Sequence, residues 1–388
     1  MKASDSLPKT GGRRFLLAAI SVLLGSLLAA MAGEAFFRGA GLKAPDLGRF
    51  FRISNGADLQ FPGRAGHTVI DLYRSNPRGS FPIDLRDAAT RQRLLRDRFT
   101  RVDEAMATNP YGVEFVYDSR GFRDREFAPR IRGVQRIVFV GDSFTEGQGV
   151  VESATAARQV ETILRRRERV EVWNLGVRDQ DFPRLIARLE AALELDPDAI
   201  IYAMVLNDAD RDRGLARNWP RINDWITVHK PAASWLEAHS YLVGFVADRY
   251  QRFRVSRDTI AWYRALYSEA NYEGWKRTRA ALQAFRAECQ RRGIRFGVTL
   301  WPLLIGLEPG ATYPFEAAHA QIERGVERAG IPFLDLLPTL RGRDSASLWV
   351  HTNDLHPNER AQALVAPVLA DFTRLRLLEA AEVRLVAK

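Results

Sequence analysis

Residues 136–334 alternate between two kinds of segment, and this alternation constrains the fold more than any other feature of the chain. Short apolar runs rich in β-branched residues are separated by longer stretches whose apolar residues recur every three to four positions. The apolar runs are Ile137–Val140, Val170–Trp173, Ala199–Met204, Phe296–Leu300 and Pro332–Leu334, and the longer stretches are Ala154–Arg167, Phe182–Leu195, Tyr272–Arg292 and Pro314–Ala329. Strands that alternate with helices predict a parallel sheet covered on both faces, followed by a last helix at about Glu359–Leu378.

The whole chain is predicted to contain four regions. Residues 1–14 are expected to form a cytoplasmic tail, 15–37 a transmembrane anchor or signal segment, 38–130 a preface rich in glycine, proline and arginine, and 131–388 the α/β domain. Residues 209–271 interrupt the alternation with a polar stretch and then an aromatic, arginine-rich one. Their position after a strand end suits a lid or a substrate-shaping insertion, because ligands of such sheets bind beyond the carboxyl ends of strands.

The amino terminus carries an apolar segment that predicts the topology. Phe15–Ala32 contains no charge, four basic residues and one acid precede it, and about 18 to 20 such residues span a bilayer. Ala30-Met31-Ala32 resembles a signal-peptidase site, and Arg13-Arg14 loosely resembles a twin-arginine signal. The length of the run favours a retained anchor in the inner membrane. All three interpretations place the α/β domain outside the cytoplasm, because the positive flank stays inside.

Composition excludes several classes of protein. The net charge of +10 comes with arginines interleaved with acids along helical patterns, and no zinc-finger, recognition-helix or RNA-binding signature accompanies them. We therefore expect a solvated basic surface, or a face for anionic lipid or polysaccharide, and no nucleic-acid partner. The single cysteine, Cys289, excludes an intramolecular disulfide, and its helical spacing from apolar neighbours predicts burial. The histidines at 67, 229, 239, 319 and 351 lack metal-ligand spacing, so no metal is expected.

Ile137–Gly147 is the most informative run of the chain. In this run a buried strand ends at a Gly-Asp-Ser turn, and a helical pattern follows. Such a turn raises the hydroxyl of Ser143 to the carboxyl end of the strand and leaves backbone N–H groups free at the start of the helix. Taken alone, an ordinary Asx turn that caps a helix gives the same pattern.

Three further motifs follow at later strand ends and before the last helix. In Asn174-Leu175-Gly176-Val177, Gly176 would let a backbone N–H approach a substrate oxygen. In Leu206-Asn207-Asp208, the Asn207 amide would complete an oxyanion hole. In Asp354-Leu355-His356, an imidazole comes with a nearby carboxylate. Alone, each has a simpler explanation: a turn, a loop-capping asparagine or an exposed loop histidine.

In combination, Ser143, Gly176, Asn207 and His356 resemble the four blocks that name the SGNH hydrolases, or GDSL type. The resemblance extends over about 117–375 and indicates an SGNH hydrolase-like domain. It implies a flavodoxin-like three-layer α/β/α fold with a parallel sheet, and an esterase or acyl-transfer site at the carboxyl edge of that sheet.

Two departures from the family pattern bear on the site. Val205 stands where the third block has glycine, and Asn353 stands where the last block has the aspartate of Asp-x-x-His. Asp354 is predicted to orient His356 instead, because a carboxylate stabilises an imidazolium better than an amide does. A Ser-His dyad is the alternative. The Asp-x-His spacing also occurs in relatives that acylate bacterial polysaccharides, and Asp118–Asp124 resembles the preface of membrane-anchored members.

The resemblance implies acyl transfer with Ser143 as nucleophile, His356 as its base, and an oxyanion held by the N–H groups of Ser143 and Gly176 and the side chain of Asn207. It implies no cofactor. Three functions are compatible with these residues. The first is a membrane-anchored extracytoplasmic esterase acting on acyl esters, acetyl esters above all, of cell-envelope carbohydrate or lipid. The second is a polysaccharide O-acyltransferase supplied by a membrane acyl-donor partner. The third is a non-catalytic envelope-assembly protein.

Overall fold

The computed structural model describes residues 10–41, 68–73, 83–84, 89, 111–178, 182–212, 215, 235–351 and 354–379. The chain divides into two compact units. The first contains Met1–Leu47 and His229–Thr259, and the second contains Gly48–Val228 and Ile260–Lys388.

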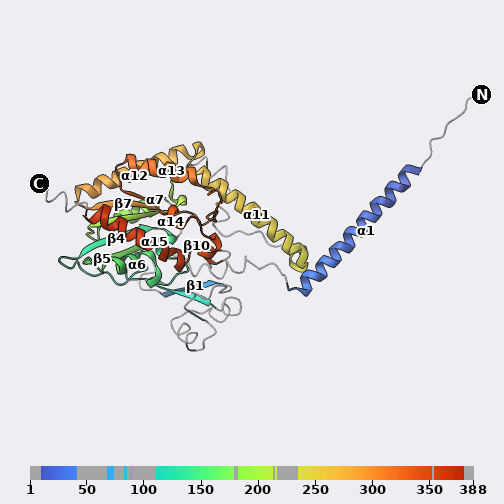
Figure 1. The fold of residues 1–388 in the computed structure, drawn as a ribbon, viewed down its shortest axis with the longest axis horizontal. Coiled ribbons are helices and arrows are strands. Elements are labelled where there is room, and N and C mark those ends of the chain that lie inside the picture. The colour runs from blue at the N-terminus through green and yellow to red at the C-terminus, as the bar shows by residue number, and fades with distance from the viewer. Residues whose placement is uncertain are drawn as a thin grey trace, which may run out of the picture. The chain divides into compact units, whose positions relative to one another are not determined.

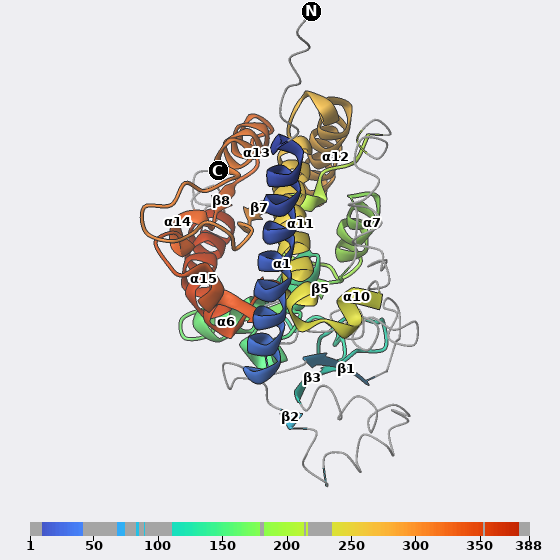
Figure 2. The same ribbon diagram turned by 90° about the vertical axis from the view of Figure 1, so that its right-hand side faces the viewer.

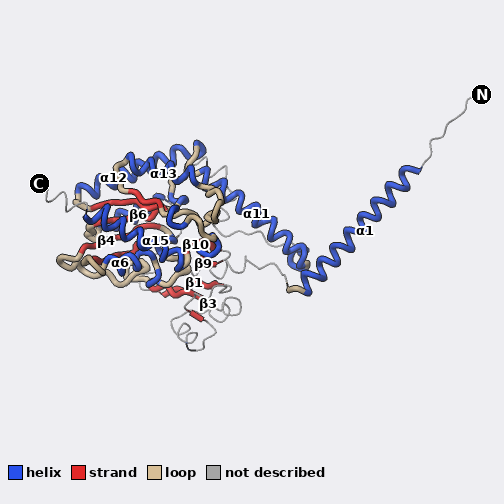
Figure 3. The backbone as a smooth tube through the Cα atoms, viewed as in Figure 1, coloured by secondary structure: helices blue, strands red, loops and turns tan. Residues whose placement is uncertain are grey.

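A five-stranded parallel sheet forms the centre of the second unit (Figure 3). Its strands are β4 (Gln135–Gly141), β5 (Val170–Gly176), β6 (Ala199–Met204), β7 (Arg295–Leu300) and β8 (Phe333–Asp335). They lie in the order β5-β4-β6-β7-β8, and each neighbouring pair is parallel. Numbered along the chain, this is the flavodoxin-like order. The predicted fold is therefore confirmed.

Helices cover both faces of this sheet (Figure 1). They are α6 (Ala156–Leu164), α7 (Phe182–Leu193), α12 (Tyr272–Arg291), α13 (Glu316–Arg328) and α15 (Glu359–Phe372). α6 packs against α15 on one face, whereas α12 packs against α7 and α13 on the other. Every residue of β5 and β6 is buried, because helices exclude water from both sides of the sheet. This double coverage explains why the central strands appear in the sequence as mainly apolar runs.

Shorter elements complete the second unit. They are the helices α5 (Ser143–Glu146) and α14 (Leu337–Leu340), the 3₁₀ turns η2 (Glu152–Ala154), η3 (Leu206–Asp208), η4 (Glu269–Asn271) and η5 (Ser345–Leu348), the π-helix η6 (Thr373–Leu378) and the antiparallel pair β9 (Trp349–His351) and β10 (Asp354–Pro357). A small antiparallel sheet joins β1 (Thr68–Tyr73), β3 (Tyr111–Val116) and β2 (Ile83–Asp84) in that order.

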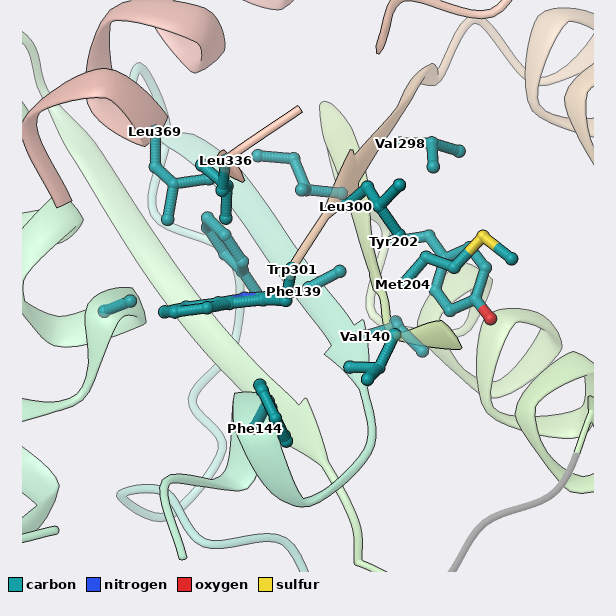
Figure 4. Close-up of a cluster of buried hydrophobic side chains, with 14 of the residues drawn as sticks. Phe139, Val140, Phe144, Tyr202, Met204, Val298, Leu300, Trp301, Leu336 and Leu369 are labelled. Carbon is teal, nitrogen blue, oxygen red and sulfur yellow. The ribbon is translucent and has the colours of Figure 1, made fainter. Parts of the chain in front are cut away.

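The core lies between the sheet and its helices and extends beneath the end of β4. Figure 4 shows Phe144 beside Trp301 in this cluster, with their ring centroids 5.9 Å apart. Cys289 is fully buried in α12, as its spacing predicted, and burial raises the pKa of its thiol to about 12. The thiol is therefore protonated and unreactive at neutral pH.

The first unit contains the long helix α1 (Thr10–Gly39), the short helix α10 (Trp235–His239) and most of α11 (Tyr241–Ala265). Residues Phe15–Gly39 of α1 are long and apolar enough to cross a membrane, and their most apolar stretch is not buried against the rest of the chain. A signal segment would have the same length and composition.

Candidate active site

The register of the sheet brings three loops to the same edge. Gly141 at the end of β4 is level with Gly176 of β5 on one side and with Ala203 of β6 on the other. The chain leaves β4 for β5 in one direction and reaches β6 in the other, so this edge is the topological switch point where such sheets bind ligands. Ser143 and Asn207 follow the strands that flank the switch point.

Ser143, His356 and Asp354 form one chain of hydrogen bonds at this edge. The distance from His356 Nε2 to Ser143 Oγ is 2.7 Å, and His356 Nδ1 contacts Asp354 Oδ1. Ser143 is 9% exposed, and the His356 side chain is 24% exposed. The structure thus brings together the predicted nucleophile, base and orienting acid.

The Asp-x-His spacing works here because these residues lie on a strand. Asp354 and His356 both belong to β10, and side chains two positions apart in a strand point to the same side. The Asp354 carboxylate also accepts the backbone N–H of His356 at 3.1 Å, which fixes the turn of the chain between them. Asn353, the residue at the family's usual position for the acid, lies outside the described residues.

Asp142 shapes the start of α5 and also contacts Asn207. Its carboxylate accepts the N–H of Phe144 at 2.9 Å, as an N-cap does, and it also accepts a hydrogen bond from the Asn207 side chain. Among the hydrogen bonds of the described residues, none uses the N–H of Ser143. An oxyanion beside Ser143 could therefore accept a hydrogen bond from that N–H. Asp142 also holds the amide of Asn207 by a hydrogen bond.

Gly176 packs tightly against the backbone of Thr145 and Glu146, and its N–H already donates to Asn174. A Cβ at this position would lie 2.2 Å from the backbone nitrogen of Glu146, so only glycine fits. The N–H of Gly176 donates to Asn174 Oδ1 at 2.9 Å, and Asn174 Nδ2 donates to the Thr145 carbonyl at 2.8 Å. A Gly176 N–H that binds an oxyanion would have to share its hydrogen bond with Asn174.

Comparison with known proteins identifies the family of this chain. The sequence model of the GDSL-like lipase/acylhydrolase family matches residues 139–364, which is more than half of the chain. The chain belongs to this family. The predicted resemblance is thereby confirmed, and the protein is a serine hydrolase. No curated protein matches the sequence.

Several solved structures are similar to this GDSL-family chain at low sequence identity. The α/β hydrolase LAE5 from the metagenome of Lake Arreo is 14% identical, covers 62% of this chain and 94% of its own, and has a TM-score of 0.39. The psychrotrophic esterase EstA from Pseudoalteromonas sp. is 12% identical, with 63% and 98% covered and a TM-score of 0.37. The acetylxylan esterase Axe2 from Geobacillus stearothermophilus is 13% identical, with 61% and 93% covered and a TM-score of 0.38.

The electrostatics of this GDSL-family site favour a charged histidine. Burial opposes protonation of His356, but the charge and hydrogen bond of Asp354 outweigh it and raise the pKa of the imidazole above its ordinary 6.5. Burial would raise the pKa of Asp354, but the positive charge and hydrogen bonds of His356 lower it to about 2. The Asp354 carboxyl is therefore ionised at neutral pH and stabilises the protonated form of His356.

Gln148 is a residue of the site that the sequence did not reveal. Its Nε2 donates to Asp354 Oδ2 at 3.0 Å, and its backbone N–H donates to the Ser143 carbonyl at 3.0 Å. The segment that carries Ser143 therefore also holds Asp354. The only available signal was the position of Gln148 five residues after Ser143 in one turn, and a polar loop residue has many simpler explanations.

Arg123 of the preface binds the turn that follows Ser143. Its guanidinium donates to the carbonyls of Glu146, Gly147 and Val150 at 3.1, 2.7 and 2.5 Å, and the side chain is almost fully buried. These carbonyls belong to the last residue of α5, to its C-cap and to the loop that follows. The preface motif thus fixes the end of the short helix that begins with Ser143.

Asp124, the next residue, holds the neighbouring strand. Its carboxylate accepts the N–H of Asn174 at 2.6 Å and pairs with Arg158. Burial raises the pKa of Asp124 to about 6, although the positive charge of Arg158 and the backbone N–H of Asn174 both lower it. The Asp118–Asp124 segment, which the sequence marked only by resemblance, therefore contacts two of the strand ends that carry the site.

The described residues contain no candidate cluster of metal ligands. Within the ranges that the structure describes, no group of three or more His, Cys, Asp or Glu side chains could hold a metal ion. His319 is buried in α13, with Nδ1 2.9 Å from Asp335 Oδ2 and Nε2 3.3 Å from the Tyr313 hydroxyl. This trio links β8 to the preceding loop, and His67 and His229 lie outside the described residues.

Proposed function

We propose that this GDSL-family hydrolase is a membrane-anchored serine esterase that acts outside the cytoplasm on acyl esters of cell-envelope carbohydrate or lipid, acetyl esters above all. The observation that carries the proposal is the hydrogen-bonded chain from Ser143 through His356 to Asp354 at the switch point of the sheet. No other arrangement within the described residues combines a serine, a histidine and a carboxylate in this way.

The proposed chemistry has two steps. His356 Nε2 takes the proton of Ser143 as Oγ attacks the ester carbonyl carbon, and the carbonyl electrons move to its oxygen. The tetrahedral intermediate then expels the alcohol, which receives the proton from His356, and an acyl-serine remains. In the second step water gives a proton to His356 as it attacks the acyl carbon. The second tetrahedral intermediate then releases the acid, and the Ser143 oxygen leaves and receives the proton from His356. Asp354 stabilises the imidazolium during both transfers.

The oxyanion is proposed to bind the N–H of Ser143 and the side chain of Asn207, with the N–H of Gly176 shared between the oxyanion and Asn174. Loss of one such donor typically costs about 10²–10³ in rate. Asn207→Ala should therefore leave a folded protein with a kcat reduced by that factor. An undiminished kcat in this variant would remove Asn207 from the site.

Membrane anchoring rests on α1. The most apolar stretch of this helix is not buried against the described part of the chain, and the basic residues before it favour a cytoplasmic amino terminus. The esterase would then face the cell envelope, where acylated carbohydrates and lipids are its available substrates.

The test is hydrolysis of p-nitrophenyl acetate by the full chain in detergent, beside Ser143→Ala. Ser268→Ala serves as the matched control, because Ser268 is an exposed serine that caps η4 and bonds neither His356 nor Asp354. We expect turnover in the parent and the control and none in Ser143→Ala, with equal circular dichroism spectra throughout. Equal rates in all three proteins would remove Ser143 from the mechanism on this ester.

The same residues would serve a polysaccharide O-acyltransferase if a sugar hydroxyl replaced water in the second step. Incubation with an acetyl donor and an acceptor oligosaccharide separates the two functions. Release of free acetate indicates the esterase, whereas acetylated sugar without net acetate release indicates the transferase. A protein that does neither, and whose cellular role survives Ser143→Ala, would be the non-catalytic assembly protein.

A further inference from the structure

Glu34, near the end of α1, caps the first turn of α11. Its carboxylate accepts hydrogen bonds from the Ser240 hydroxyl at 2.7 Å and from the backbone N–H groups of Tyr241 and Leu242 at 3.1 and 2.9 Å. The first N–H groups of a helix have no acceptor within the helix itself. A side chain from the apolar helix therefore supplies the cap that α11 needs at its first turn.

Other contacts make this junction a packed joint between the two helices (Figure 1). Arg38 donates to Glu34 and to the carbonyl of His239, each at 2.6 Å. The rings of Phe37 and Phe245 lie 4.8 Å apart. A Cβ on Gly33 would lie 3.1 Å from a methyl of Leu242, so α11 approaches α1 closely at this turn.

The position of Glu34 along α1 sets the depth of this joint in a bilayer. About 20 apolar residues span the hydrocarbon layer, and Glu34 is the first ionisable residue after the run that begins at Phe15. An ionised carboxylate belongs at the level of the lipid headgroups rather than in hydrocarbon. The start of α11 and the preceding helix α10 are bonded to this residue and its neighbours, so they share its depth.

The side chains that α10 exposes suit that depth. Trp235 is 72% exposed and Leu236 is 52% exposed, and Phe36 at the end of α1 is 64% exposed. Trp235 stacks on His239, whose carbonyl accepts the hydrogen bond from Arg38. Tryptophan is enriched at the boundary between hydrocarbon and headgroups.

We propose that α10 and the first turn of α11 form a second membrane-attachment element, in which Trp235 and Leu236 insert among the lipid headgroups of the leaflet where α1 ends. The proposal rests on the membrane anchor assigned to α1 above. It gives this part of the 209–271 insertion a role in holding the enzyme to the lipid surface, in place of the role as a lid that its sequence suggested.

The experiment uses the full chain in vesicles of phosphatidylcholine and phosphatidylglycerol that contain spin-labelled lipid. The one native cysteine is buried, so Cys289→Ala provides a background in which a single new cysteine can carry an environment-sensitive fluorophore. The probe positions are Trp235→Cys on α10, Val22→Cys on α1 as the reference for the anchor, and Ile131→Cys as the matched exposed apolar position in the second unit. Hydrolysis of p-nitrophenyl acetate checks that each variant is folded.

We expect the label at 235 to shift to shorter wavelength on reconstitution and to be quenched by lipid spin-labelled near the headgroup, while the label at 131 is not. The label at 22 should be quenched by lipid spin-labelled deep in the acyl chain. If 22 is quenched and 235 behaves like 131, the second attachment is wrong and the anchor stands. If 22 is not quenched, the anchor is wrong and this proposal is wrong with it. Glu34→Ala should reduce quenching at 235 but not at 22, and unchanged quenching at 235 would refute the role of the Glu34 joint.

Discussion

Replacing Gly176 with alanine tests how closely the end of β5 must approach α5, the short helix that begins with Ser143. The new Cβ would lie 2.2 Å from the nitrogen of Glu146 and 2.6 Å from the carbonyl carbon of Thr145, whereas ordinary contact begins at 3.4 Å. Both atoms are backbone, so they cannot rotate away. The loop after β5 and the helix that begins with Ser143 must therefore separate by about 1 Å, a misplacement that typically lowers the rate about 10²-fold.

The assay is kcat/KM for p-nitrophenyl acetate together with urea unfolding of the same protein in detergent. Overpacking should lower the free energy of unfolding by about 1–3 kcal/mol, so the variant remains folded when its rate is measured. Gly297→Ala is the matched control in β7. Its Cβ would meet the ring of Phe372 at 3.0 Å and a methyl of Leu377 at 3.2 Å, which are ends of side chains that can shift. This control should lose stability but keep its kcat/KM. A folded Gly176→Ala protein with the parental kcat/KM would refute the argument from close approach.

Three further predictions follow from the hydrogen bonds of the second unit. Because Asp354 raises the pKa of His356 above 6.5, the acid limb of kcat/KM in the parent should lie above pH 6.5. Asp354→Asn should move that limb to lower pH and reduce kcat by about 10⁴. Asn353→Ala should change neither the limb nor kcat. If the limb of Asp354→Asn stays in place, Asp354 is not the orienting acid. Gln148→Leu removes one hydrogen bond to the same carboxylate, so pH-rate profiles should show a lower kcat with KM unchanged, and a change in KM alone would argue against positioning. Arg136→Leu leaves the buried partner of its 2.5 Å ion pair uncompensated and should cost about 3–5 kcal/mol in urea unfolding, with parental kcat/KM in the folded fraction.

The fold was predictable because its central strands are buried on both faces. These strands therefore appear in the sequence as short, mainly apolar runs, and the helices α6, α7, α12 and α13 appear as apolar repeats between them. The departure at Val205 also has a physical explanation. Its backbone is extended, with φ −120° and ψ 162°, which any residue adopts, so glycine is not required at this position in this chain.

Other parts of the site were not predictable because they depend on contacts between distant segments. The hydrogen bond from Gln148 to Asp354 joins residues 206 positions apart, and the bonds from Arg123 reach carbonyls that carry no side-chain signal. The sequence also left two explanations of the Gly-Asp-Ser turn open, a structural cap or a nucleophile. In the structure Asp142 caps the helix while Ser143 contacts His356, so the two explanations describe neighbouring residues of one turn and do not exclude each other.

The segment from Asp142 to Gln148 therefore connects nearly every part of the site. Asp142 holds the Asn207 amide, Phe144 packs its ring 5.3 Å from that of His356, and Gln148 holds Asp354. A shift of this segment would move Ser143 together with the contacts that hold Asn207 and Asp354. Substitutions within it should consequently be non-additive, because each changes groups that the others also contact. A site built on one short segment depends on how rigidly that segment is held. Arg123 of the preface holds this segment through the Gly147 carbonyl, and Asp124 holds the neighbouring end of β5 through the N–H of Asn174.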